Sequence, residues 1–256
     1  MPDELQIVPA RVEEYPVLQS QHEHLPKCPM RCYLYGPSGS GKTVLLQNMI
    51  TRLYRTKSGR SCFTRVFVFS PTVHVDPQWH SVKKFAIEEL KTPPDQECFF
   101  DHFDDKDVEK VLSEQKAIVE KVKEYKRRKE WKGAFPQVLV CLDDLLDDQH
   151  AMRNSKLLWE LSARGRHALV NLIVASQYVR GAHPILRSNV TSWICFQPRN
   201  EKEAQAIAEE HSAAYGLNKT KNILRAATKL PHGFLYINST APIGQRFWMN
   251  FKEPIG

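Results

Sequence analysis

The sequence predicts an α/β fold in which helices flank a mostly parallel β-sheet, and three observations lead to this prediction. Short apolar runs alternate along the chain with longer segments whose apolar residues recur at helical spacing. Some runs, such as 138–142, are almost continuously apolar, which is typical of parallel strands that are covered on both faces. A glycine-rich segment, 36–43, stands between the first apolar run and the first helical pattern, which gives the order strand, loop, helix.

The length and composition of the chain fit one domain of this kind. Its 256 residues are enough for a single α/β domain with a buried core, and a hydrophobic content of 42% excludes wholesale disorder. We therefore assign residues 28–256 to one domain and residues 1–27 to an N-terminal arm or lead-in. No apolar run approaches the roughly 20 residues that a membrane-spanning helix needs.

The apolar runs predict the strands, in chain order. Strands are expected at 31–35, 66–69, 138–142, 168–176 and 192–196. Two further runs, 233–237 and 246–249, are expected to pair as a C-terminal antiparallel hairpin. Residues 71–104 follow Ser70-Pro71, a dipeptide that ends a strand, and are expected to be irregular.

Helical spacing of apolar residues and helix-forming composition predict the helices. They are expected at 43–54, 107–131, 151–163, 201–211 and 217–229. In the second of these, apolar residues such as Val108, Val111 and Leu112 form one stripe, and Gly133 and Pro136 follow its end.

The segment 36–43 matches the phosphate-loop pattern G-x-x-x-x-G-K-[ST] at every fixed position. Its glycines allow successive backbone N–H groups to face one anion, and the following helix adds its positive N-terminal end. We expect Lys42 to contact the β- and γ-phosphates and the Thr43 hydroxyl to bind Mg²⁺. The predicted ATP-binding residues are Gly36, Pro37, Ser38, Gly39, Ser40, Gly41, Lys42 and Thr43.

Two carboxylates end the apolar run 138–142. Asp143 and Asp144 follow it directly, about 100 residues after the phosphate loop. At the carboxyl end of a parallel strand, such residues lie at the same edge of the sheet as the loop. We expect Asp143 to bind Mg²⁺ and Asp144 to accept a hydrogen bond from the attacking water.

The strand predicted at 168–176 has candidate functional residues at both ends. Gln177 follows it, and its neutral amide can hydrogen-bond the γ-phosphate or the attacking water. Arginines precede it, and an arginine from a neighbouring subunit suits a phosphoryl-transfer transition state. Arg166 is the first candidate for this role, with Arg164 and Arg187 as alternatives.

The chain is basic, with a formal net charge of +7 and a pI of about 9.1, which favours a polyanionic partner. Residues 121–132 alone hold seven Lys and Arg against Glu124 and Glu130. We favour a solvated helix face for them and keep contact with nucleic-acid phosphates as the alternative. The six cysteines are expected to be reduced, and the compartment intracellular.

Four segments together resemble a known family. They are GPSGSGKT at 36–43, VFVFSPT at 66–72, VLVCLDD at 138–144, and GRHALVNLIVASQ at 165–177. In this order they are similar to the poxvirus-type viral genome-packaging ATPases, a branch of the FtsK/HerA superfamily of additional-strand P-loop NTPases. The resemblance covers roughly residues 31–200.

The resemblance implies a RecA-like P-loop core that hydrolyses ATP with Mg²⁺. It implies a homo-oligomeric ring, a pentamer or hexamer, through which double-stranded DNA passes, with capsid or portal-vertex proteins as partners, inside the host cell or in the virion. By motif match, Lys42 and Thr43 lie on phosphate and Mg²⁺, Asp143 on Mg²⁺, Asp144 is the general base and Gln177 the sensor. Related motors often have Asp-Glu at the acidic pair, so Asp144 is one methylene shorter than usual.

The leading functional prediction is therefore ATP-driven translocation of double-stranded DNA, which packages a viral genome into a preformed capsid. The first alternative is a cellular-type DNA translocase or helicase on the same core. A small-molecule kinase is a further alternative, but the sequence shows no convincing phosphate-binding lid. A nucleotide-binding assembly subunit is the last, and the intact Lys42, Thr43, Asp143 and Asp144 argue against it.

Overall fold

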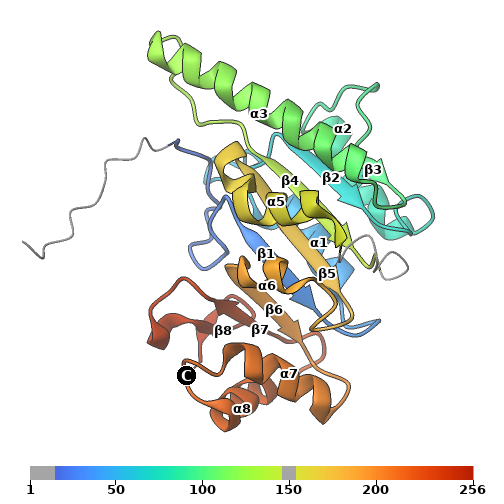
Figure 1. The fold of residues 1–256 in the computed structure, drawn as a ribbon, viewed down its shortest axis with the longest axis vertical. Coiled ribbons are helices and arrows are strands. Elements are labelled where there is room, and N and C mark those ends of the chain that lie inside the picture. The colour runs from blue at the N-terminus through green and yellow to red at the C-terminus, as the bar shows by residue number, and fades with distance from the viewer. Residues whose placement is uncertain (1–14, 146–153, 256) are drawn as a thin grey trace, which may run out of the picture.

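The computed structural model describes residues 15–145 and 154–255, and at its centre lies one β-sheet (Figure 1). Within these residues the sheet has nine strands in the order β3-β2-β4-β5-β1-β6-β7-β8-β9. The strands are β1 (Arg31–Tyr35), β2 (Arg65–Phe69), β3 (Phe99–Phe100), β4 (Val138–Asp143), β5 (Val170–Ser176), β6 (Ser192–Phe196), β7 (Phe234–Asn238), β8 (Phe247–Met249) and β9 (Glu253–Pro254). From β3 to β6 all neighbours pair in parallel, and β7, β8 and β9 add antiparallel pairs, which confirms the predicted fold class and the C-terminal hairpin.

The strand order places β5 between the phosphate-loop strand β1 and the acidic strand β4. In the register, Tyr35 of β1 lies opposite Ser176 of β5, and Asp143 of β4 lies opposite Ala175 of β5. All residues of β4 and β5 are buried, as continuous apolar runs in parallel strands require. The three strands therefore end almost level, at one edge of the sheet.

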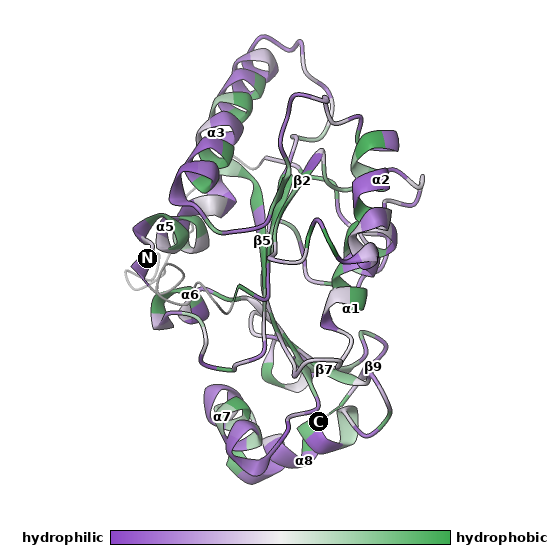
Figure 2. Cartoon of the chain, turned by 90° about the vertical axis from the view of Figure 1, so that its right-hand side faces the viewer, coloured by the Kyte–Doolittle hydropathy of each residue, from purple (hydrophilic) through white to green (hydrophobic). Residues whose placement is uncertain are grey.

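Helices cover both faces of the sheet (Figure 2). They are α1 (Lys42–Asn48), α2 (His80–Glu88), α3 (Asp105–Arg127), α5 (Lys156–Arg164), α6 (Pro184–Ser188), α7 (Glu201–His211) and α8 (Leu217–Ala227). Buried side chains of α1 and α2 pack on one face, together with the fully buried Trp79. Buried side chains of α3, α5, α6, α7 and α8 pack on the other. Each large apolar side chain buried in this way contributes about 1.5–3 kcal/mol to folding.

The segment predicted to be irregular, 71–104, in fact contains a 3₁₀ turn (Pro77–Trp79), helix α2 and the short strand β3. The Asp76 carboxylate caps the turn by accepting a hydrogen bond from the backbone N–H of Gln78. Only Val82, Phe85 and Ala86 are buried in α2, and so few apolar positions do not reveal a helix in the sequence.

Other predicted boundaries shift by a few residues. Strand β5 begins at Val170 because residues 165–168 form a 3₁₀ turn and Leu169 has a left-handed backbone, with φ of 56°. Helix α1 ends at Asn48 and continues as a π-helical turn over Met49–Leu53. Helix α5 begins at Lys156, and residues 151–153 of the predicted helix lie outside the described residues.

The described part of the N-terminal segment, 15–27, lies against the domain. The ring of Tyr15 is 4.9 Å from that of Phe135, and Leu25 is buried. The Gln19 side chain exchanges two hydrogen bonds with the backbone of Cys28. The division of the chain at residue 27 stays a prediction.

All six cysteines are free and buried. Within the described ranges, no helix combines the length and the apolar character needed to cross a membrane.

Candidate active site

The phosphate loop, residues 36–41, leaves β1 at the carboxyl edge of the parallel strands. Gly39 and Gly41 have φ of 75° and 103°, a left-handed backbone conformation that residues other than glycine rarely adopt. The backbone N–H of Gly36 donates to the carbonyl of Ser176 on β5 and fixes the start of the loop. The loop and the N-terminus of α1 thus have the geometry of an anion site.

Lys42 is the first residue of α1, and its side chain is turned back into the loop. Its Nζ donates to the carbonyl oxygens of Gly36 at 2.7 Å and Pro37 at 3.0 Å. Burial lowers the pKa of Lys42, and the carboxylates of Asp144 and Asp143 oppose this effect. The ammonium group is therefore held where it can move from loop carbonyls to a bound phosphate.

Thr43 and Asp143 meet beside the loop. The Thr43 hydroxyl donates to Oδ2 of Asp143 at 3.3 Å. The other oxygen, Oδ1, is buried and has no hydrogen-bond partner among the described residues. A hydroxyl and an unsatisfied carboxylate oxygen are the oxygen ligands that Mg²⁺ prefers, so these residues fit the predicted ion.

Burial, and then the nearby Asp144 carboxylate, raises the pKa of Asp143 from 3.8 to about 6. Asp143 therefore binds its proton more tightly in the folded chain than in the unfolded one. Its contribution to stability is complete below the unfolded pKa and is lost as the pH rises through the folded pKa. In the metal-free protein at neutral pH, the charged Asp143 destabilises the fold.

This effect predicts how Asp143→Asn changes the pH dependence of unfolding. In EDTA, we expect the free energy of unfolding of the wild type to fall relative to the variant by about 2 kcal/mol between pH 4 and pH 7. Urea unfolding at several pH values measures the difference. Parallel profiles for the two proteins would show that the folded protein does not raise this pKa.

Asp144 and Gln177 are in direct contact. Gln177 Nε2 donates to Oδ2 of Asp144 at 2.7 Å. Asp144 has φ of 52°, and its N–H donates to the carbonyl of Ala175, so its backbone turns across the end of β5. Oδ1 of Asp144 is buried without a hydrogen-bond partner in the described structure, and it can accept a hydrogen bond.

The structure places Arg166 away from these residues. It is exposed, in the 3₁₀ turn before β5, while Gln177 follows the other end of that strand. The seven residues of β5, at about 3.3 Å each, separate the two by roughly 20 Å. Arg164 ends α5, on the same side as Arg166, and Arg187 is ion-paired with Glu210. The loop, Asp143, Asp144 and Gln177 come together within this chain, and the candidate arginines do not join them.

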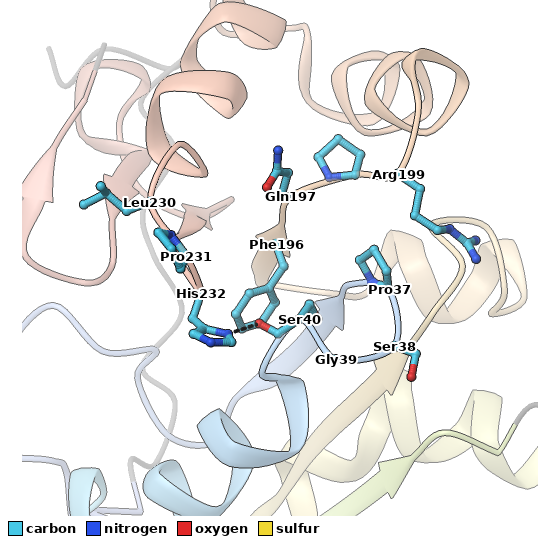
Figure 3. A pocket seen from close by; sticks show the side chains of 12 residues that line it. Pro37, Ser38, Gly39, Ser40, Phe196, Gln197, Arg199, Leu230, Pro231 and His232 are labelled. Atoms are coloured by element: carbon cyan, nitrogen blue, oxygen red, sulfur yellow. Dashed lines mark hydrogen bonds between the residues drawn. The ribbon is translucent and has the colours of Figure 1, made fainter.

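Sequence reasoning missed one wall of the site (Figure 3). A cavity of about 370 Å³ lies between the phosphate loop, the end of β6 and the turn after α8. It is lined by Pro37, Ser38, Gly39, Ser40, Phe196, Gln197, Pro198, Arg199, Leu230, Pro231, His232 and Gly233. Nδ1 of His232 lies 3.1 Å from the carbonyl of Ser40, as the dashed line shows. The cavity's lining of apolar side chains with a few polar groups is typical of small-molecule sites.

Arg199 is the cation of this wall. Its guanidinium is ion-paired with Glu203 at 2.6 Å, and the hydroxyl of Tyr35, the residue before the loop, donates to the same carboxylate at 2.6 Å. Arg199 also lies over the ring of Tyr178, next to Gln177. In the sequence, the one indication of this wall is the polar segment that follows the predicted strand 192–196, at the same edge of the sheet as the loop.

A phosphate loop on β1, an acidic pair at the end of β4 and a strand between them define an α/β protein of the additional-strand P-loop class. Residues 18–237 match the family described as Poxvirus A32 protein. Because this match covers most of the chain, the protein belongs to that family. The poxvirus-type assignment from the sequence is thereby confirmed. A search of curated proteins gave no match.

Solved structures share the fold at low sequence identity. The genome packaging NTPase B204 from Sulfolobus turreted icosahedral virus 2, in complex with AMP, is 17% identical with a TM-score of 0.55, over 89% of this chain and 98% of that one. B204 from Sulfolobus turreted icosahedral virus, described as a DNA-packaging ATPase, is 16% identical with a TM-score of 0.52, over 90% and 99%. The conjugation coupling protein TcpA of pCW3 is 17% identical with a TM-score of 0.50, over 86% and 60%.

Proposed function

We propose that this protein hydrolyses ATP to translocate double-stranded DNA and thereby packages a viral genome into a preformed capsid. The observation that carries the hydrolytic part is the contact between Gln177 and Asp144, next to the pair of Thr43 and Asp143. A base and a neutral amide joined beside a phosphate loop suit a water nucleophile.

The side chains then have the following roles. Lys42 leaves the carbonyls of Gly36 and Pro37 and stabilises the charge that develops on the γ-phosphoryl. Oδ1 of Asp144 accepts a hydrogen bond from the attacking water, while Gln177 holds the orientation of the carboxylate. Thr43 and Asp143 hold Mg²⁺, which neutralises phosphate charge when bound.

The DNA part of the proposal rests on the family and on the fold. The two B204 structures named above belong to genome-packaging proteins, and the fold of almost their whole length recurs here. The basic charge of the chain suits sequence-independent contacts with DNA phosphates. We propose a homo-oligomeric ring, a pentamer or hexamer, that acts with capsid or portal-vertex proteins inside the host cell.

A second candidate is DNA translocation outside packaging, as in plasmid transfer. It is favoured by the likeness to the conjugation coupling protein TcpA, which shares the fold over 86% of this chain. The catalytic steps are the same in both candidates, so the difference lies in the partner proteins.

The test is ATP turnover with and without duplex DNA. We expect duplex to stimulate turnover, and the DNA concentration for half-stimulation to rise steeply between 50 and 200 mM salt, by about 10³-fold if some six phosphates are contacted. Phosphate release at several salt concentrations measures both. Turnover that ignores duplex at every salt concentration would contradict a DNA motor and leave only an ATPase.

A further inference from the structure

The positive charge of the chain is concentrated at one place. Residues 121–132 contain seven Lys and Arg and two Glu, so they carry five of the seven net positive charges of the whole protein. The remaining 244 residues are nearly balanced. A basic surface that served only solubility would not need this concentration.

This segment is the far end of α3, which stops at Arg127, together with the residues that follow it. The helix begins after β3, near the edge of the sheet that holds the active site, and runs back along the sheet. In Figure 1 its light-green C-terminal end projects beyond the strands at the top. The basic residues therefore lie beyond the edge of the parallel strands that is opposite the phosphate loop, and both places can be occupied at once.

The end of α3 is firmly held. Val119 and Val122 are buried against Phe135 and Leu169. Nζ of Lys123 lies 4.7 Å from the centre of the Tyr15 ring, and Nζ of Lys126 lies 5.6 Å from that of Phe135. Two of the seven basic residues thus serve packing by cation–π contact.

Of the other five basic residues, only Lys121 has an aromatic contact within the described residues: its Nζ lies 6.0 Å from the centre of the exposed ring of Tyr125. All five are exposed, and none forms an ion pair with a carboxylate in the described part of the chain. We call them the basic end of α3: Lys121, Arg127, Arg128, Lys129 and Lys132. Elsewhere many basic side chains are paired, as Arg180 is with Glu209 and Arg225 with Glu201.

Helix capping does not explain the set. Cations near a helix C-terminus are stabilised by the helix dipole, but this effect is confined to the last turn. Arg127 lies in that turn, whereas Lys121 precedes it and Lys132 follows the helix. At least two members of the set therefore need another explanation.

We propose that the basic end of α3 binds the phosphate backbone of duplex DNA. From Lys121 to Arg128 the helix axis advances about 10 Å. Duplex DNA carries about one phosphate charge per 1.7 Å of its axis, so several phosphates face this length. The inference rests on the proposed function, and it assigns to this surface the DNA contact that the proposed function requires.

The test compares two quadruple variants of the full-length protein. In the first, Lys121, Arg127, Arg128 and Lys132 are replaced by glutamine, which has a similar helix propensity. In the matched control, Arg52, Lys57, Arg60 and Lys91 are replaced by glutamine. These four are also exposed and follow α1 and α2, on the other face of the sheet, so the net charge changes equally.

We expect the first variant to bind a 30-base-pair duplex at least about tenfold more weakly than the control at 100 mM salt. The slope of log K against log salt should fall in magnitude by about 3 to 4, because each lost phosphate contact removes about 0.9. Turnover without DNA should equal that of the control, and both variants should unfold at the wild-type temperature.

Three outcomes would overturn the inference. If the wild type binds duplex and the two variants bind it equally, the DNA surface lies elsewhere and the proposed function stands. If the wild type binds no duplex at any salt concentration, both this inference and the proposed function fail. If the first variant keeps DNA binding but loses binding to vesicles of phosphatidylcholine and phosphatidylserine, the surface is a membrane contact.

Discussion

Replacing Lys42 with alanine should lower ATP turnover by about 10²- to 10³-fold, the loss typical of removing one preorganised charge donor from a transition state. The structure shows why no other group compensates. Lys42 is the cation enclosed by the loop carbonyls, and Arg199, the nearby cation in the described structure, is engaged by Glu203. The measurement is steady-state phosphate release at saturating ATP and Mg²⁺.

The control is Lys57→Ala, which removes an exposed lysine shortly after α1 and its π-helical turn. It should retain wild-type turnover. Thermal unfolding should show that both variants fold. If Lys42→Ala kept turnover within a few-fold of the wild type, the nucleotide site would have been assigned to the wrong loop.

The parts of the site that follow from the sequence are those that lie at strand ends. Parallel strands carry their carboxyl ends to one edge, so the loop, Asp143 and Gln177 are predicted to lie at the same edge of the sheet without knowledge of the strand order. The hydrogen bond between Gln177 and Asp144 is more than this rule predicts. It depends on the left-handed backbone of Asp144, which apolar periodicity does not reveal.

The part of the wall formed by His232 could not be predicted in the same way. His232 reaches the loop from a turn 192 residues away from Ser40, because β7 pairs antiparallel with β6 and brings that turn back to the active edge. This depends on the order of strands in the sheet. Likewise, α2 has too few buried positions for its periodicity to stand out.

Arg166→Ala should lower turnover by about 10³-fold or more if Arg166 is the arginine finger of a ring. Within one chain it cannot reach the phosphates, since the length of β5 lies between them. The pKa of Arg31 is lowered mainly by burial, and the nearby positive charge of Arg166 lowers it further. An exposed arginine beside a second cation is more stable when an anion approaches from outside, as the nucleotide of a neighbouring subunit would.

Mixing subunits tests this arrangement directly. Arg166→Ala subunits supply an intact Asp144, and Asp144→Asn subunits supply an intact Arg166. In an equal random mixture, about one quarter of the interfaces contain both residues, so turnover should recover to about that fraction of wild type if the finger acts in trans. A finger acting in cis allows no recovery, because no subunit has both residues.

The matched control is Arg164→Ala, from the end of α5 just before the same turn. Arg164→Ala subunits should keep wild-type turnover on their own. Loss of turnover by Arg164→Ala alone, with recovery to about one quarter when it is mixed with Asp144→Asn, would move the role to Arg164.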